Sequence, residues 1–358
     1  MAGGRHYLLP AGVGKGVRND GMDIREAWKK LGGNRHVMSK IAEFENHTVG
    51  NDEHVLGVFY DREDIDYTPH MRVLTGEKPV MPRLVNMTEM ALEILKKQST
   101  KEGFFLMVEG SYIDKYTHWS RMHLALDEVN EMDLAIQAAV AHAPPDTLIV
   151  VTADHAHALT IPGYLSKQDS VFDYIGEPET DEPVYPHLFL ATGPGYHGQI
   201  GSTFTDEERD NVNFTTPTAR YFTDGKHGGE DVGIWAHGPY SWLFTGTIEN
   251  TQVAYNIKYL LCLHEKDSGE RNICDEDHSH KKEKKKPKSS ATTSTWFSSL
   301  CSLAAVSLLR LDAWPWCHSS SCSTVTNTFV GIKGTPSATA TSRRSTGDKM
   351  AMEMEDQA

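Results

Sequence analysis

Three stretches of this chain concentrate carboxylate and imidazole side chains, the groups that bind metal ions in proteins. The first contains Glu109, Asp114 and His118, the second is Thr-Ala-Asp-His-Ala-His at 152–157, and the third is His-Gly-Gly-Glu-Asp at 227–231. Short apolar runs precede the first two stretches, so each set is expected where a buried strand ends. Ligands gathered at the ends of neighbouring strands predict a metal site in a crevice beside an α/β sheet.

The types of ligand predict more than one kind of metal ion. Asp114, His118 and His227 offer two imidazoles and one carboxylate, a set that suits zinc with open positions for water or substrate. Glu109 offers only oxygen atoms, which suit magnesium. Several divalent cations held close together can polarise a phosphoryl oxygen, so the residues favour phosphoryl chemistry.

The same residues also have structural interpretations. Asp154 and His155 are adjacent, and in a regular strand their side chains would point to opposite faces. Both can serve one site only if the strand ends there and the backbone turns. Asp114 and His118 alone could be a carboxylate at a helix amino terminus and an unrelated imidazole. The metal interpretation depends on three ligand-rich stretches occurring together in one chain.

Apolar periodicity predicts an α/β fold with a central, largely parallel sheet flanked by helices. Predicted strands and helices alternate along the first part of the chain, as expected for such a sheet. The predicted strands are 55–59, 104–108, 147–152, 187–191 and 232–236, and the predicted helices are 23–31, 87–97, a long one between His118 and Pro144, and 250–263.

Composition divides the chain into a domain at 1–278, the candidate catalytic domain because it holds all three ligand-rich stretches, and a low-complexity tail at 279–358. The tail opens with a lysine run at 281–288 and continues rich in serine and threonine, so we expect it to be disordered and outside the fold. The formal net charge of -14 argues against nucleic acid as a partner, because a phosphate backbone would be repelled.

The sequence features that indicate a cellular compartment disagree with one another. Three glycosylation sequons begin at Asn46, Asn86 and Asn213, and Cys262 and Cys274 bracket a short polar loop that a disulfide could close. These features favour secretion. The first residues have no apolar core, so this sequence shows no signal peptide at its start.

Taken together, these motifs resemble the animal-type alkaline phosphatases. The resemblance is carried by Val-Glu-Gly at 108–110, by Asp114 and His118, and by the stretches at 152–157 and 227–232. It covers residues 2 to 265. It implies hydrolysis of phosphate monoesters through a phosphoserine intermediate, with two zinc ions and one magnesium ion per subunit.

The resemblance also implies a role for each ligand. Asp114, His118 and His227 would hold the first zinc, and Asp154 and His155 the second. Glu109 would bind magnesium, and His157 would lie close to the metal site and the phosphate. The resemblance further implies a homodimer outside the cell, held at the surface by a glycolipid anchor. Residues 289–309 resemble a degraded anchor signal.

Departures from the family pattern lead to alternative interpretations. The family's nucleophilic serine and its bridging aspartate belong to a region before the part that this sequence matches, and no serine here is assigned as nucleophile. We therefore expect weak turnover from this chain alone, because losing a nucleophile costs several orders of magnitude in rate. The alternatives are an inactive metal-binding or dimerising remnant and a related phosphodiesterase or sulfatase.

Overall fold

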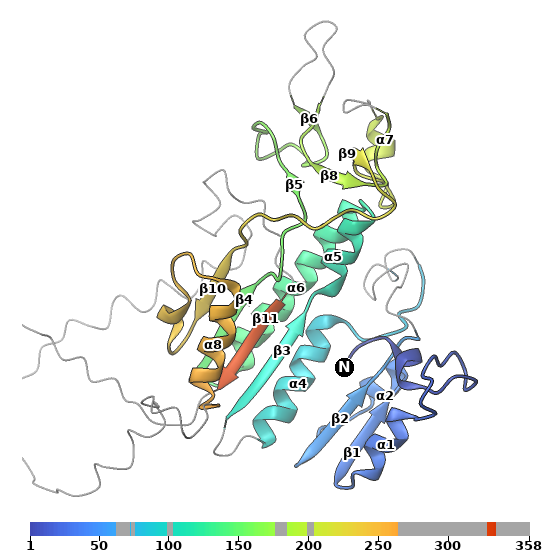
Figure 1. Cartoon of the computed structure of the whole chain (residues 1–358), viewed down its shortest axis with the longest axis vertical. Helices are drawn as coiled ribbons and strands as arrows, with labels where there is room; N and C mark the ends of the chain where they lie inside the picture. Colours follow the sequence, from blue (N-terminus) through green and yellow to red (C-terminus); the bar gives the residue numbers. More distant parts are fainter. Residues whose placement is uncertain are drawn as a thin grey trace, which may run out of the picture.

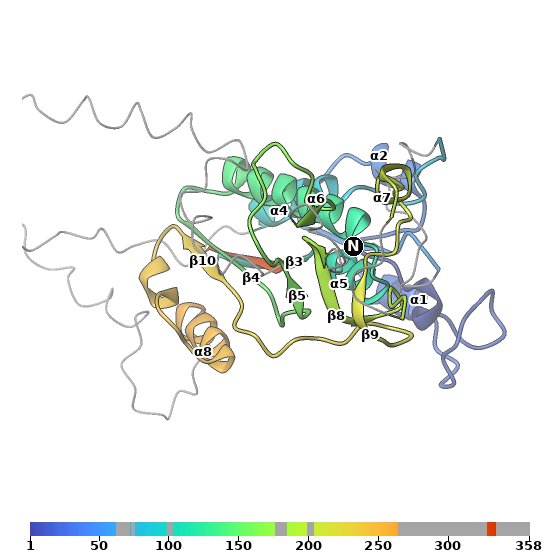
Figure 2. The same cartoon turned by 90° about the horizontal axis from the view of Figure 1, so that it is seen from above.

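The computed structural model of the protein describes residues 1–61, 72, 76–98, 103–175, 185–198, 204–263 and 328–333. Over these residues the chain forms a mixed α/β fold around a four-stranded sheet (Figure 1). Seen from above, α4 (Leu84–Gln98) and α6 (Met122–His142) lie on one side of the sheet and α8 (Asn250–Leu260) on the other (Figure 2). The predicted α/β fold with helices flanking a sheet is therefore confirmed.

The central sheet brings the carboxyl ends of two of its strands to one edge. Its strands, in spatial order, are β10 (Ile234–His237), β4 (Thr147–Thr152), β11 (Thr328–Lys333) and β3 (Phe104–Glu109). Because β11 is antiparallel to both β3 and β4, these two strands run in the same direction. Glu109 and Thr152 are both paired with Thr328, so the ligand-rich segments that follow β3 and β4 begin at the same edge.

The strand directions differ from the predicted ones in one respect. All three pairings within this sheet are antiparallel, whereas a largely parallel sheet was expected. Parallel pairing occurs instead in two smaller sheets, between β1 (Asn34–Met38) and β2 (Glu53–Gly57) and between β8 (Phe189–Gly193) and β9 (Thr218–Tyr221). Strands β3 and β4 do run in the same direction, but β11 lies between them and runs the opposite way, so neither has a parallel neighbour in this sheet.

Strand β11 also corrects the expected extent of the fold. Its residues lie within the segment 279–358 that was predicted to be disordered, yet they pair with β3 and β4 along their whole length. The physical reason is the space between β3 and β4, where backbone groups of both strands need partners. The other residues of the predicted tail lie outside the described residues.

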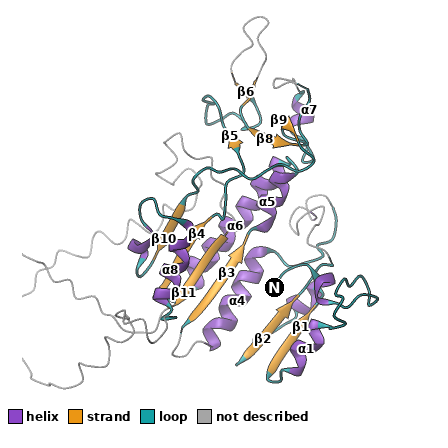
Figure 3. Ribbon diagram, in the orientation of Figure 1, coloured by secondary structure: helices purple, strands orange, loops and turns teal. Residues whose placement is uncertain are grey.

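Helices cover both faces of β4 with separate apolar clusters (Figure 3). On one face, α4 (Leu84–Gln98) and α6 (Met122–His142) bury Leu92 and Met132 against Ile149. On the other, α8 (Asn250–Leu260) and the 3-10 helix η2 (Ser241–Phe244) pack against Leu148 and Val150. Successive β4 residues thus face opposite layers, as the pleat of a strand requires.

A third cluster joins the helical layer to a small sheet at the far end of α5 (Ser111–His118). This sheet has the order β5 (Leu159–Thr160), β8, β9, and α7 (Asp206–Arg209) lies close to it (Figure 1). Tyr116 of α5 and Leu124 of α6 are fully buried with Leu190 of β8. The cluster fixes the end of α5 against β8, which matters for the site described below.

The remaining elements complete the described part of the chain. They are η1 (Arg5–Leu8), α1 (Ile24–Lys30), α2 (Ile41–Glu45), β6 (Tyr174–Ile175) and β7 (Tyr185–Pro186). Cys262, just after α8, takes part in a disulfide, and the predicted partner Cys274 lies outside the described residues. Among the described helices, none is both long enough and apolar enough to cross a membrane.

Candidate metal centre

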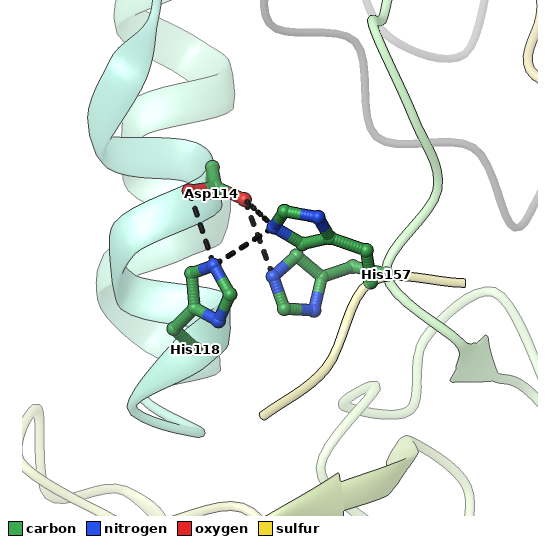
Figure 4. Close-up of side chains that lie close together, drawn as sticks. Asp114, His118 and His157 are labelled. Carbon is green, nitrogen blue, oxygen red and sulfur yellow. Dashed lines mark hydrogen bonds and ion pairs between the residues drawn. The ribbon is translucent and has the colours of Figure 1, made fainter. Parts of the chain in front are cut away.

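Asp114 and His118 project from the same side of α5 (Figure 4). No helix was among those predicted for this segment, but the chain forms an eight-residue helix that begins directly after Gly110. A separation of four residues places two side chains on one helical face. The Asp114 Oδ2 and His118 Nε2 atoms are 3.4 Å apart, so the helix itself supplies the first pair of ligand-type atoms.

The segment that follows β4 brings two further imidazoles to this face of α5. The strand ends at Thr152, and the backbone then turns, with a positive φ of 50° at Ala158. His157 is buried and His155 is partly exposed, with side-chain exposures of 6% and 26%. Both imidazoles thus approach Asp114 from the segment beyond the end of the strand.

The carboxylate of Asp114 lies at the centre of these imidazoles. Its Oδ1 atom is 3.3 Å from Nε2 of His157, 3.5 Å from Nε2 of His227 and 3.8 Å from Nε2 of His155. His227 arrives from a distant part of the chain, and its Nε2 atom is 3.0 Å from Nε2 of His118. One carboxylate therefore faces four imidazoles that come from three separate segments.

Four of these residues form what we call the ligand group: Asp114, His118, His157 and His227. One ligand-type atom from each lies within 4.8 Å of the others. Asp114 Oδ1 and His157 Nε2 are both buried, and neither has a hydrogen-bond partner of good geometry among the described residues. A buried carboxylate oxygen and a buried imidazole nitrogen without such partners fit a cation between them, and a mixed carboxylate and imidazole set suits zinc.

Backbone carbonyls set the tautomers of two imidazoles. Nδ1 of His118 is 2.5 Å from the carbonyl oxygen of Gly225, and Nδ1 of His155 is 3.2 Å from that of Ala156. A carbonyl can only accept, so each Nδ1 carries the proton and donates it. Each Nε2 is then left with a lone pair directed toward Asp114, which is the arrangement that metal-binding histidines use.

The pKa values of Asp114 and His227 are both shifted by burial and by the neighbouring groups of the site. Burial alone would raise the pKa of Asp114, but its contact with His157 and the charges of His118, His157 and His155 outweigh burial and lower that pKa. Burial and the neighbouring His155 lower the pKa of His227, although Asp114 opposes them. A lowered pKa keeps the Asp114 carboxylate ionised and the His227 imidazole neutral, and these are the forms that bind a divalent cation.

Glu109 and Asp154 border the ligand group without belonging to it. Burial raises the pKa of Glu109, and the negative charges of Asp154 and Asp114 raise it further, so the three carboxylates lie within electrostatic reach of one another. Asp154 Oδ2 is 3.5 Å from Nε2 of His155. Two further carboxylates thus lie near the imidazoles of the ligand group.

A cavity of about 470 Å³ lies beside this edge, between β3 and the amino-terminal residues. Glu109, Ser111 and Tyr112 line it, whereas no member of the ligand group does. The candidate site is therefore the ligand group and not this cavity, because the convergent polar atoms lie outside the cavity.

Two residues that hold the site were missed in the sequence. The Gly225 carbonyl accepts a hydrogen bond from His118 Nδ1, and Thr192 of β8 accepts a hydrogen bond from the amide of Lys226 beside His227. A glycine two residues before a conspicuous histidine is a weak signal that the backbone approaches another element closely. Thr192 gives no signal of its own, because its partner is a distant backbone amide.

Comparison with known proteins gives a consistent result for most of the chain. A family model for alkaline phosphatase matches residues 1–263. Alkaline phosphatase 4 of Drosophila melanogaster is 33% identical over 268 residues, which cover 69% of this chain and 44% of that protein. The tissue-nonspecific alkaline phosphatase isozyme of Homo sapiens is 32% identical over 286 residues, covering 74% and 52%.

Two further proteins are similar to this chain. A membrane-bound alkaline phosphatase of Bombyx mori is 31% identical over 279 residues, covering 74% of this chain and 49% of that protein. The crystal structure of a cold-active alkaline phosphatase from a psychrophilic Shewanella species has a TM-score of 0.44 at 21% identity, covering 73% of this chain and 64% of the other. The chain spans about half the length of the curated relatives that it matches.

Proposed function

Because the chain belongs to the alkaline phosphatase family, we propose that it forms the metal-binding part of a phosphate monoester hydrolase. One observation carries the proposal: the Asp114 carboxylate lies 3.3 to 3.8 Å from four imidazole nitrogens. Such a group has few uses in a protein other than binding a divalent cation. The substrates are small phosphate monoesters, in keeping with the names of the relatives.

We assign the proposed metal ions to the residues as follows. Asp114, His118 and His227 hold one zinc ion, and His157 lies beside it at the phosphate side. Asp154 and His155 contribute to a second zinc ion, and Glu109 to magnesium. Bound divalent cations at such a site polarise the phosphoryl oxygen and favour attack at phosphorus.

The residues of this chain have distinct roles in the proposed site. Asp114 neutralises and orients the imidazoles around it. The Gly225 carbonyl keeps the proton of His118 on Nδ1, so Nε2 stays available. The serine that the resemblance implies as nucleophile is not assigned to any residue of this sequence, and we propose weak turnover by this chain alone.

Metal-dependent hydrolysis by the full chain tests the proposal. With zinc and magnesium supplied, we expect any turnover to be greater with para-nitrophenyl phosphate than with bis(para-nitrophenyl) phosphate or para-nitrophenyl sulfate, and to stop when a chelator is added. The measurement is the release of nitrophenol. Faster hydrolysis of the diester or the sulfate ester would contradict the monoesterase proposal. Zinc binding without any turnover would favour the alternative of an inactive metal-binding remnant.

We propose an extracellular, cell-surface location with attached glycans. Asn46, Asn86 and Asn213, the acceptor residues of the three sequons, are all exposed. The disulfide at Cys262 favours an oxidising compartment, and one relative is named as membrane-bound. The glycolipid-anchor signal predicted at 289–309 lies outside the described residues and stays a prediction. The homodimer also stays a prediction, which light scattering would test.

Glycan attachment can be measured directly. When the chain is expressed behind a secretion signal, we expect peptide-N-glycosidase to increase its gel mobility, because all three acceptor asparagines are accessible. Asn46→Gln, Asn86→Gln and Asn213→Gln should each remove part of that shift. A secreted chain whose mobility the glycosidase leaves unchanged would contradict the prediction.

A further inference from the structure

His227 is the most exposed member of the ligand group. Its side chain is 48% exposed, compared with 22% for His118 and 6% for His157. Packing therefore fixes His157 but contributes less to the position of His227. The position of the His227 imidazole relative to Asp114 therefore depends more on the backbone on either side of it.

Hydrogen bonds hold that backbone on both sides of His227. Before it, the amide of Lys226 donates to Thr192 Oγ1 at 2.8 Å, and the amide of Gly225 donates to the His118 carbonyl at 2.7 Å. After it, the amide of Gly228 donates to the Ala156 carbonyl at 2.7 Å. Among these bonds, the one from Lys226 is the one that a side chain accepts.

Thr192 lies on a rigid support. It belongs to β8, which pairs with β9 through Thr192 and Arg220 and packs by Leu190 into the buried cluster around Tyr116. A threonine side chain is also stiff because of its branched Cβ atom. The hydroxyl is thus held by a strand that is itself fixed against α5.

The loop carrying His227 passes closely between β8 and the end of α5. A Cβ atom added to Gly225 would lie 3.0 Å from the Thr192 carbonyl oxygen and 3.4 Å from the His118 carbonyl oxygen. The loop therefore contacts both elements at once, and a small displacement of it would separate His227 from His118.

We propose that Thr192 is a positioning residue of the metal centre. Its hydroxyl fixes the Lys226 amide and thereby directs His227 toward Asp114 and His118. The inference deepens the proposed function and rests on the metal site assigned there. Thr192 does not contact the metal ion itself, so its effect is exerted through His227.

Zinc affinity of the full chain tests this role without reliance on turnover. Zinc is removed and then titrated back in competition with a chromogenic chelator. We expect Thr192→Val, which keeps the shape but removes the acceptor, to weaken zinc binding by about 10-fold, the lower end of the usual cost of losing a supporting hydrogen bond. Thr192→Ser keeps the hydroxyl and should bind zinc nearly as the natural chain does.

Two controls separate positioning from other effects. Thr245→Val removes a hydroxyl that donates to the Trp242 carbonyl at 2.9 Å, and it should leave zinc affinity unchanged. The visible absorption of bound cobalt(II) reports the ligand geometry and should change in Thr192→Val but not in Thr192→Ser. A merely structural role for Thr192 would lower the melting temperature without altering that absorption.

Each outcome has a defined meaning. Thr192→Val that is folded and binds zinc within about twofold of the natural chain overturns the proposal, since supporting groups are expected to matter more than this. If His227→Ala also leaves zinc affinity unchanged, the metal site itself fails. If Thr192→Val is unfolded, Thr192→Ala is measured in the same way, and loss of folding in both would assign Thr192 to folding and overturn the positioning role.

Discussion

Replacing Asp114 by asparagine should abolish tight zinc binding. Asp114→Asn keeps the size of the side chain but removes the negative charge that faces four imidazoles. Loss of a group that only supports a ligand costs about 10- to 100-fold in metal affinity, so loss of the central carboxylate should cost at least about 100-fold. Zinc titration in competition with a chelator measures the effect, and metal-dependent hydrolysis should fall in parallel.

A matched substitution distinguishes the site from general electrostatics. Asp146 is exposed and precedes β4, at the end of the strand away from the ligand group. Asp146→Asn changes the net charge by the same amount and should leave zinc affinity as it is. Equal affinities for Asp114→Asn and the natural chain would show that the ligand group does not bind zinc. Cobalt(II) absorption would report whether a cation still occupies the group with altered coordination.

The convergence of Asp114, His118 and His227 illustrates what a sequence can predict. Each ligand-rich stretch is recognisable locally, because carboxylates and imidazoles follow an apolar run or flank glycines. The carboxyl ends of β3 and β4 then meet at one edge, as expected for strands that run in the same direction. The structure brings the three residues together, whereas their roles as metal ligands remain to be measured.

The loop before His227 illustrates what a sequence cannot predict. The contacts of Gly225 and Thr192 join backbone atoms to elements that are distant in the chain, and no periodicity reports such contacts. A different reason explains why the helix at Ser111–His118 was not predicted. Its apolar residues are few and its start has no side-chain cap, so the usual signals for a helix start are absent.

Strand β11 was missed because strand pairing is non-local. Thr328–Lys333 is a short run within a serine- and threonine-rich segment, and composition alone placed it outside the fold. Its place depends on two strands more than 170 positions earlier in the chain, which no local pattern encodes. The family similarity ends at residue 263, so it could not have indicated this strand either.

A proline in β11 should destabilise the central sheet strongly. Gly331 is paired with both Leu106 of β3 and Ile149 of β4, so Gly331→Pro removes a donor from a strand with neighbours on both sides. We expect the free energy of unfolding to fall by about 2 to 4 kcal/mol, from the lost bond, the unpaired partner and the clash of the ring. Urea denaturation followed by circular dichroism gives the value.

Hydrogen exchange can separate loss of this strand from general instability. If β11 leaves the sheet, β3 and β4 gain open edges, and the amides that faced β11 should exchange faster. Gly331→Ala keeps the backbone amide at the same position, so it is the matched control and should leave the exchange of β3 and β4 largely unchanged. Unchanged protection of β3 and β4 in Gly331→Pro would show that these strands do not depend on β11, and that the fold is held by the helical layers on its two faces.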